Sequence, residues 1–110
     1  MNKDRLQQLK DFLAEEPDNA FLHYAIALEY RRSQPDVAER MMDEVIAKFG
    51  DYLPALHTAA LWKWEDGKHT EAALLLKRGI ALAGEKGDAS ALRELRSAWQ
   101  ELTGEVWEEN

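Results

Sequence analysis

The three histidines are the residues of this chain whose spacing most resembles a chemical site. His23 and His57 are separated by 34 residues, and His69 follows. Two stacked imidazoles could ligate zinc, but a zinc site needs three or four ligands in fixed geometry. The chain has no His-x-x-x-His spacing. We therefore expect no metal site, and we interpret the histidines as half-buried aromatic residues or as residues facing a partner.

The remaining reactive side chains also fail to form a catalytic pattern. Carboxylate pairs such as Glu15/Glu16 and Glu108/Glu109 lie at expected helix ends or in the tail, without the burial or charged neighbour that catalytic pairs need. No glycine-rich phosphate loop is present, and the glycines at 84 and 87 are expected to form a flexible break. The chain has no cysteine. We expect no catalytic residue, no cofactor and no enzymatic activity.

Composition sets further bounds on the function. The chain has 110 residues, which is one domain, and 14 basic against 21 acidic residues give a net charge of −7. An acidic surface disfavours nucleic-acid phosphates as partners. No window has the length and apolar character of a membrane span, and the N-terminal residues do not resemble a signal peptide. We expect a cytoplasmic protein with neither nucleic-acid nor membrane partners.

An internal repeat of 34 residues organises the middle of the chain. It appears when Phe21–Pro54 is aligned with Ala55–Asp88. A repeat of this length that contains two helical stretches is typical of a stacked helix-turn-helix array. The identical positions are Leu22/Leu56, His23/His57, Ala25/Ala59, Ala38/Ala72, Ile46/Ile80, Ala47/Ala81 and Gly50/Gly84.

Apolar periodicity predicts six helices and no strand. Within each repeat an inner helix that is apolar nearly all round precedes an outer helix with a single apolar stripe. The predicted ranges are about 3–16, 19–32, 35–49, 51–66, 69–83 and 88–102.

Local signals predict how these helices begin and end. Asp18 or Asn19 can cap the second helix, and Asp36 with Glu39 has capping-box spacing for the third. Gly50 is expected to stop the third helix in a left-handed conformation.

These features resemble the tetratricopeptide repeat family. The residues that carry the resemblance are His23, Ile26, Ala27, Tyr30, Ala38, Met42, Val45, Ile46 and Gly50 in the first repeat, and Leu56, Ala59, Ala60, Gly67, Ala72, Leu76, Gly79, Ile80 and Gly84 in the second. Lys63 replaces the family's tyrosine, and glycine replaces its closing proline. The stretch Leu22–Tyr30 also resembles small bacterial proteins of this repeat class, a resemblance that brings no function with it.

The resemblance implies an all-α fold, a right-handed superhelix of about six helices in antiparallel pairs. It divides the chain into one domain at 1–104 and an acidic tail at 103–110. Within the domain, 1–17 is a half-repeat, 18–50 and 51–84 are the two repeats, and 87–102 is a capping helix.

The same resemblance implies a concave groove lined by the inner helices, which would bind a peptide or helix of a partner protein. The groove positions fall at Phe21, Tyr24, Leu28, Arg31 and Arg32, and at Pro54, His57, Leu61, Trp64 and Glu65. The alternative for Leu28, Leu61, Tyr24 and Trp64 is core between layers. Because arginines and a histidine border this groove, we expect a partner with an apolar anchor and an acidic flank.

Two other functions stay open at this point. The chain could be a self-associating array, a weak homodimer, or the end of a longer solenoid, with Trp62–Trp64 and Trp107 as contacts between copies. An enzyme is the third alternative.

Overall fold

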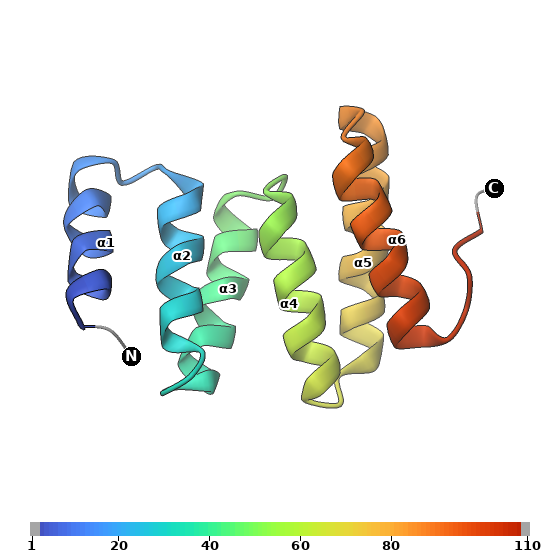
Figure 1. Cartoon of the computed structure of the whole chain (residues 1–110), viewed down its shortest axis with the longest axis horizontal. Helices are drawn as coiled ribbons and strands as arrows, with labels where there is room; N and C mark the ends of the chain where they lie inside the picture. Colours follow the sequence, from blue (N-terminus) through green and yellow to red (C-terminus); the bar gives the residue numbers. More distant parts are fainter. Residues whose placement is uncertain (1–2, 109–110) are drawn as a thin grey trace. The chain divides into compact units, whose positions relative to one another are not determined.

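The computed structural model describes residues 3–108, and these residues form six α-helices and no strand (Figure 1). The all-α prediction is therefore confirmed. The helices are α1 (Lys3–Glu15), α2 (Ala20–Tyr30), α3 (Pro35–Lys48), α4 (Leu53–Glu65), α5 (His69–Lys86) and α6 (Ala89–Thr103). No helix in this part of the chain has both the length and the apolar character needed to cross a membrane.

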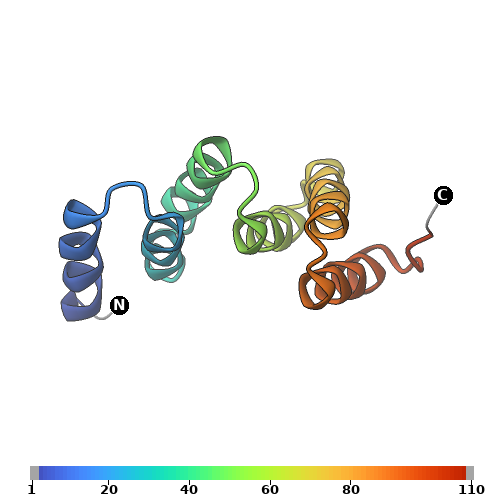
Figure 2. The ribbon, with the colours of Figure 1, turned by 90° about the horizontal axis from the view of Figure 1, so that it is seen from above.

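The chain divides into two compact units, Met1–Tyr52 and Leu53–Asn110, near the expected junction between the repeats. The first unit holds α1, α2 and α3, and the second holds α4, α5 and α6. Within the first unit α2 packs against both α1 and α3. Within the second, α5 lies on one side while α4 and α6 lie on the other (Figure 2).

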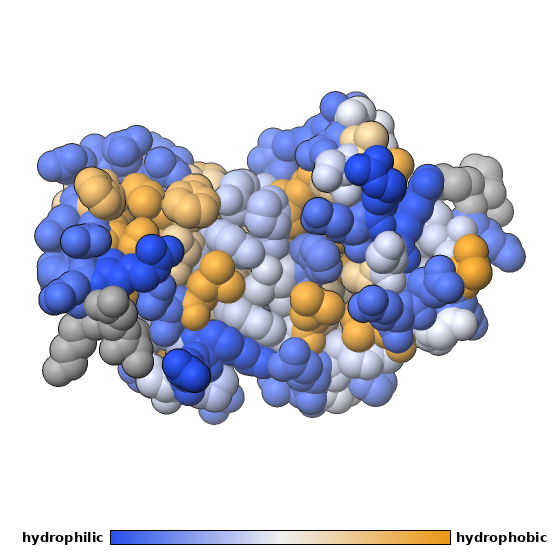
Figure 3. Space-filling model, in the orientation of Figure 1, coloured by the Kyte–Doolittle hydropathy of each residue, from blue (hydrophilic) through white to orange (hydrophobic). Residues whose placement is uncertain are grey.

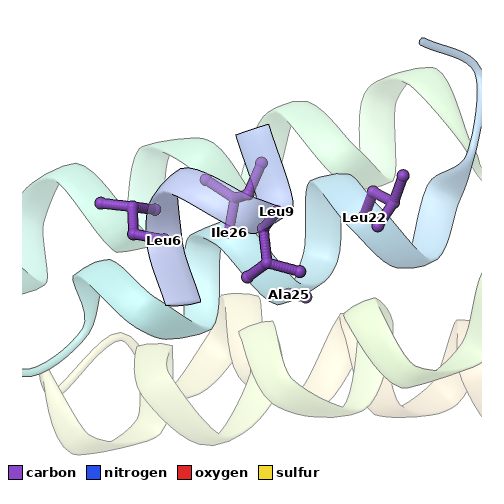
Figure 4. Packing of buried hydrophobic residues seen from close by; sticks show 5 residues of the cluster. All are labelled: Leu6, Leu9, Leu22, Ala25 and Ile26. Carbon is purple, nitrogen blue, oxygen red and sulfur yellow. The ribbon is translucent and has the colours of Figure 1, made fainter. Parts of the chain in front are cut away.

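The core of the first unit forms where α1 lies on α2. Leu6 and Leu9 of α1 meet Leu22, Ala25 and Ile26 of α2 (Figure 4). The three-to-four-residue spacing of these positions places each set on one face of its helix. Ala25 and Ala27 of α2 are both buried. Their small side chains allow the close packing of a helix that has neighbours on two sides, α1 and α3.

The core of the second unit depends on a glycine at a helix crossing. Leu56 of α4, Leu76 of α5 and Leu95 of α6 are almost completely buried. A methyl group built on Gly79 of α5 would lie 3.3 Å from both terminal carbons of Leu95. The absent side chain of Gly79 therefore lets α6 pack closely on α5.

Burial follows the 34-residue repeat. Ala38 and Ala72 are both fully buried, as are Met42 and Leu76, which occupy another pair of corresponding positions. Matching burial at matching positions means that the same faces of the corresponding helices point inward in each unit.

The predicted cap of α2 is confirmed, and the predicted cap of α3 is wrong. Asn19 Oδ1 accepts a hydrogen bond from the backbone N–H of Leu22 at 3.3 Å. Gln34, not Asp36, occupies the N-cap of α3, and its side chain makes no capping hydrogen bond. The helix begins at Pro35, as predicted, because the fixed φ of proline favours the first helical position.

Two predicted helix stops are also wrong. Helix α3 ends with Phe49 as its C-cap at φ −123°, and Gly50 is not among the glycines of positive φ. Helix α5 continues through Gly84 to Lys86, where Gly87 at φ +70° ends it. The expected flexible break at 84–87 is therefore the last turn of a helix, since a single exposed glycine weakens a helix by only about 1 kcal/mol.

Candidate functional site

In the first unit, the predicted groove residues lie on the surface of α2 and just beyond its end. Phe21 is 53% exposed and Leu28 is 41% exposed. Tyr24 and Arg31 are half-buried, and Arg32 is exposed. The core alternative for Leu28 is therefore wrong, and α2 presents an apolar stripe that ends in two arginines.

Tyr24 and its neighbours show how this face is supported. The Tyr24 ring meets the edge of Tyr52, with ring centroids 5.6 Å apart. Burial, and to a smaller extent the nearby Tyr24 hydroxyl, raises the pKa of Tyr52. The contacts of His23 are internal to the first unit. Its Nε2 donates a hydrogen bond to the carbonyl of Pro17 at 2.7 Å, and the centroid of its ring lies 5.3 Å from that of Phe49.

In the second unit, two predicted residues line a hollow of about 430 Å³ between α4 and α6. His57 and Leu61 of α4 are both half-buried. They are one helical turn apart and therefore on one face of α4. The residues that α6 contributes are Arg93, Glu94, Ser97, Ala98 and Glu101.

The chemistry of the hollow is a small apolar floor with polar walls. Leu61 and Ala98 supply the apolar surface, and His57 with Ser97 supplies uncharged hydrogen-bonding groups when the imidazole is neutral. Among the α6 residues that line the hollow, Arg93 carries one positive charge, and Glu94 and Glu101 carry two negative charges. An apolar concavity with a few polar groups is the usual form of a ligand site.

The other three predicted residues of the second unit do not line this hollow. Trp64 stacks on His69, with ring centroids 4.0 Å apart and an interplanar angle of 19°. Glu65 and Pro54 are exposed at opposite ends of α4. The stacking on the first residue of α5 explains the orientation of Trp64 and leaves it half-buried.

Lys63 is held within the second unit. It is 8% exposed, and its Nζ lies 4.0 Å from a carboxylate oxygen of Glu71 on α5. Trp62 is also buried. The stretch Trp62–Trp64 is thus mainly internal, which weakens the prediction that it contacts a second copy.

The contribution of α6 to the hollow was missed because the sequence was interpreted there as a capping helix. A signal was present, since Leu95 and Ala98 continue the apolar stripe expected of a helix that follows α4 and α5 in the stack. If α6 is treated as a further inner helix of the array, the sequence predicts that residues of α6 line the same concave surface as His57 and Leu61.

The C-terminal segment is ordered against α6 rather than extended away from it. The Trp107 ring meets the Trp99 ring edge-on, with centroids 5.0 Å apart. The Thr103 hydroxyl donates to the Trp99 carbonyl at 2.6 Å and accepts from the Glu105 N–H at 3.1 Å. Half-buried Trp107 therefore makes a contact within its own chain.

Comparisons of this chain with protein-family models, with curated proteins and with solved structures found no match. Among residues 3–108, no group of three or more His, Cys, Asp or Glu side chains is arranged to hold a metal ion. The interpretation of the surface therefore depends on the geometry of each unit.

Proposed function

We propose that this chain is a tetratricopeptide-like binding module that holds a segment of a partner protein in the hollow between α4 and α6, without catalysis. The observation that carries the proposal is the hollow itself, which has a volume of about 430 Å³ and is lined by His57 and Leu61, two residues that the family resemblance implied for a groove. A hollow of this volume can hold a side chain of a partner segment.

The face of α2 supports the same function. Phe21 and Leu28 are exposed there, and Tyr24, Arg31 and Arg32 complete the set. Tyrosine and arginine are enriched among residues that dominate protein–protein binding energy. Each unit thus carries an apolar surface bordered by polar groups, which suits recognition of a peptide.

The charges of the hollow refine the expected partner. The earlier expectation of an acidic flank used Arg31 and Arg32 of the first unit together with His57 of the second. In the hollow itself Glu94 and Glu101 outnumber Arg93. We therefore infer that the segment held there carries an apolar anchor with a basic residue beside it.

A charge substitution at Leu61 tests the proposal. Leu61→Glu places a carboxylate on the floor of the hollow, whereas Leu74→Glu makes the same change at a leucine of α5 that is 61% exposed and outside it. In pull-downs from the source cells, we expect Leu61→Glu to lose partners that Leu74→Glu retains. Circular dichroism must show equal helix content for both variants, and retention of every partner by Leu61→Glu would refute the proposal.

Self-association is the second candidate, favoured by the large apolar side chains left exposed, among them Leu74 and Val106 at 61% and 68%. Sedimentation at several protein concentrations separates the two functions. A dimer that forms with rising concentration would favour self-association, and a constant monomer would favour a binding module.

A further inference from the structure

Two phenylalanines form an exposed apolar area in the first unit. Phe12 of α1 and Phe21 of α2 are each 53% exposed. A single exposed apolar residue is ordinary, but neighbouring ones mark an interaction surface. Figure 3 shows hydrophobic side chains gathered over the upper parts of α1 and α2.

Helix geometry places these two residues at the same level of the α1–α2 pair. Arg5 of α1 forms an ion pair with Glu29 of α2, which fixes one level at which the two helices meet. The helices run antiparallel because a short turn joins them. Phe12 lies two turns beyond Arg5 on the same stripe of α1, and Phe21 lies about two turns before Glu29. Both rings therefore reach the same level of the helix pair.

Carboxylates border the two rings. Glu15, Glu16 and Asp18 are all exposed, and they lie in the last turn of α1 and the turn that follows it. Lys48 Nζ lies 3.3 Å from Asp18, so one cation meets this edge from α3. The rim stays acidic, and we name the two phenylalanines and three carboxylates the Phe12–Phe21 surface.

We propose that the Phe12–Phe21 surface docks an amphipathic helix of a partner protein whose apolar face is flanked by lysine or arginine. The apolar face would cover the two rings, and its cations would meet Glu15, Glu16 and Asp18. A second copy of this chain is a poor occupant, since a symmetric contact would place the same carboxylates opposite each other. The proposal goes beyond the function given above, because it assigns a second binding surface, which adds α1 and the acidic turn to Phe21 of the α2 face and does not depend on the hollow.

A helix is the occupant that suits α1. Helix α1 packs chiefly on α2, whereas α2 also packs on α3. Within the first unit, the side of α1 that carries the exposed Phe12 is therefore not covered by α2 or α3. Side-chain ridges on such a face accept the ridges of another helix.

The experiment compares two synthetic helical peptides on the full chain. Both carry leucines at i, i+3, i+4 and i+7; one has lysines along the flanks of this face and the other has glutamates. Fluorescence anisotropy measures the affinity of each labelled peptide for the wild type, and for Phe12→Ser, Glu15→Lys, Leu61→Glu and the control Leu74→Ser.

We expect the lysine peptide to bind at least tenfold more tightly than the glutamate peptide. Phe12→Ser should weaken it at least tenfold, while Leu74→Ser and Leu61→Glu leave it unchanged. Glu15→Lys, an exposed change that folding tolerates, should reduce the preference for the lysine peptide.

Equal affinity for both peptides, or full binding by Phe12→Ser, would overturn the inference. Loss of binding in Leu61→Glu alone would also overturn it, because the peptide would then occupy the hollow, and the proposed function would stand. A dimer that depends on Phe12 would replace the partner helix with a second copy.

Discussion

Two glycine-to-alanine substitutions in α5 measure how closely α6 packs on it. Both Gly79 and Gly84 have helical neighbours on each side, so alanine should favour the helix by a similar amount at either position, about 1 kcal/mol. Their surroundings differ, because Gly79 is buried and Gly84 is exposed. The difference between the two variants therefore isolates the effect of packing.

The structure sets the expected magnitude. The new methyl carbon at position 79 would lie 3.3 Å from both Cδ atoms of Leu95 and 3.8 Å from Cβ of Leu56, whereas nothing lies within 4 Å of the one at position 84. Carbon atoms pack best at about 3.5–4.0 Å. Because Leu95 is only 1% exposed, it has little room to move. Overpacking of this kind costs about 1–3 kcal/mol, which exceeds the gain in helix propensity.

We expect Gly84→Ala to raise the free energy of unfolding by about 0.5–1 kcal/mol and Gly79→Ala to lower it by about 1 kcal/mol. Urea unfolding followed by tryptophan fluorescence is the assay, because all four tryptophans belong to the second unit.

Two results would refute this reasoning. If Gly79→Ala is as stable as Gly84→Ala, Leu95 does not pack on Gly79. If Gly84→Ala leaves the stability unchanged, α5 ends before position 84, as the sequence alone suggested.

Three further predictions follow from particular contacts. Burial raises the pKa of Tyr52 above its ordinary value of 10.0. The stability of the first unit should therefore fall as pH rises from about 10 through the raised pKa. Tyr24→Phe should lower the pKa of Tyr52, as measured by ultraviolet titration. Trp107→Ala removes the edge-on contact with Trp99 and should lower the stability of the second unit by about 1 kcal/mol, measured by urea unfolding. Ala72→Leu adds volume at a fully buried position and should cost about 1–3 kcal/mol in the same assay, so that unchanged stability would contradict the packing of α5.

The helices could be predicted from the sequence because α1, α3, α5 and α6 each have a periodic apolar face, and α2 and α4 are apolar nearly all round. Leu6 and Leu9 on α1 show this, as do Met42 and Leu76 at corresponding positions of the repeat. Periodicity predicts which face is buried because most inward-facing residues are apolar, although Glu39 and Lys63 are buried charged residues.

Helix ends were predicted less well because several residues compete to set them. Gly84 and Gly87 are both able to stop α5, and only the second adopts positive φ. Pro35 determined the start of α3 more strongly than the capping spacing of Asp36 with Glu39. Propensity alone does not decide such competitions, which depend on the packing of the final turn.

The candidate site could be predicted only in part, for a related reason. The family resemblance predicted His57 and Leu61 as groove residues, and both line the hollow, but it did not predict Arg93 or Glu101 from α6. Residues on two different helices come together through tertiary packing. The apolar pattern of one helix does not indicate which other helix packs beside it. Phe12 likewise belongs to the apolar residues of α1 by type, but the structure leaves its side chain 53% exposed.

Site-specific crosslinking tests the central claim most directly. A photoreactive amino acid is placed at position 61, in the hollow, and in a control chain at position 74, outside it. After illumination in the source cells, mass spectrometry locates the crosslinked residues. The account predicts that position 61 crosslinks to one contiguous segment of a partner protein and that position 74 does not. The same crosslinks from both positions, or crosslinks from position 61 to its own chain alone, would contradict it.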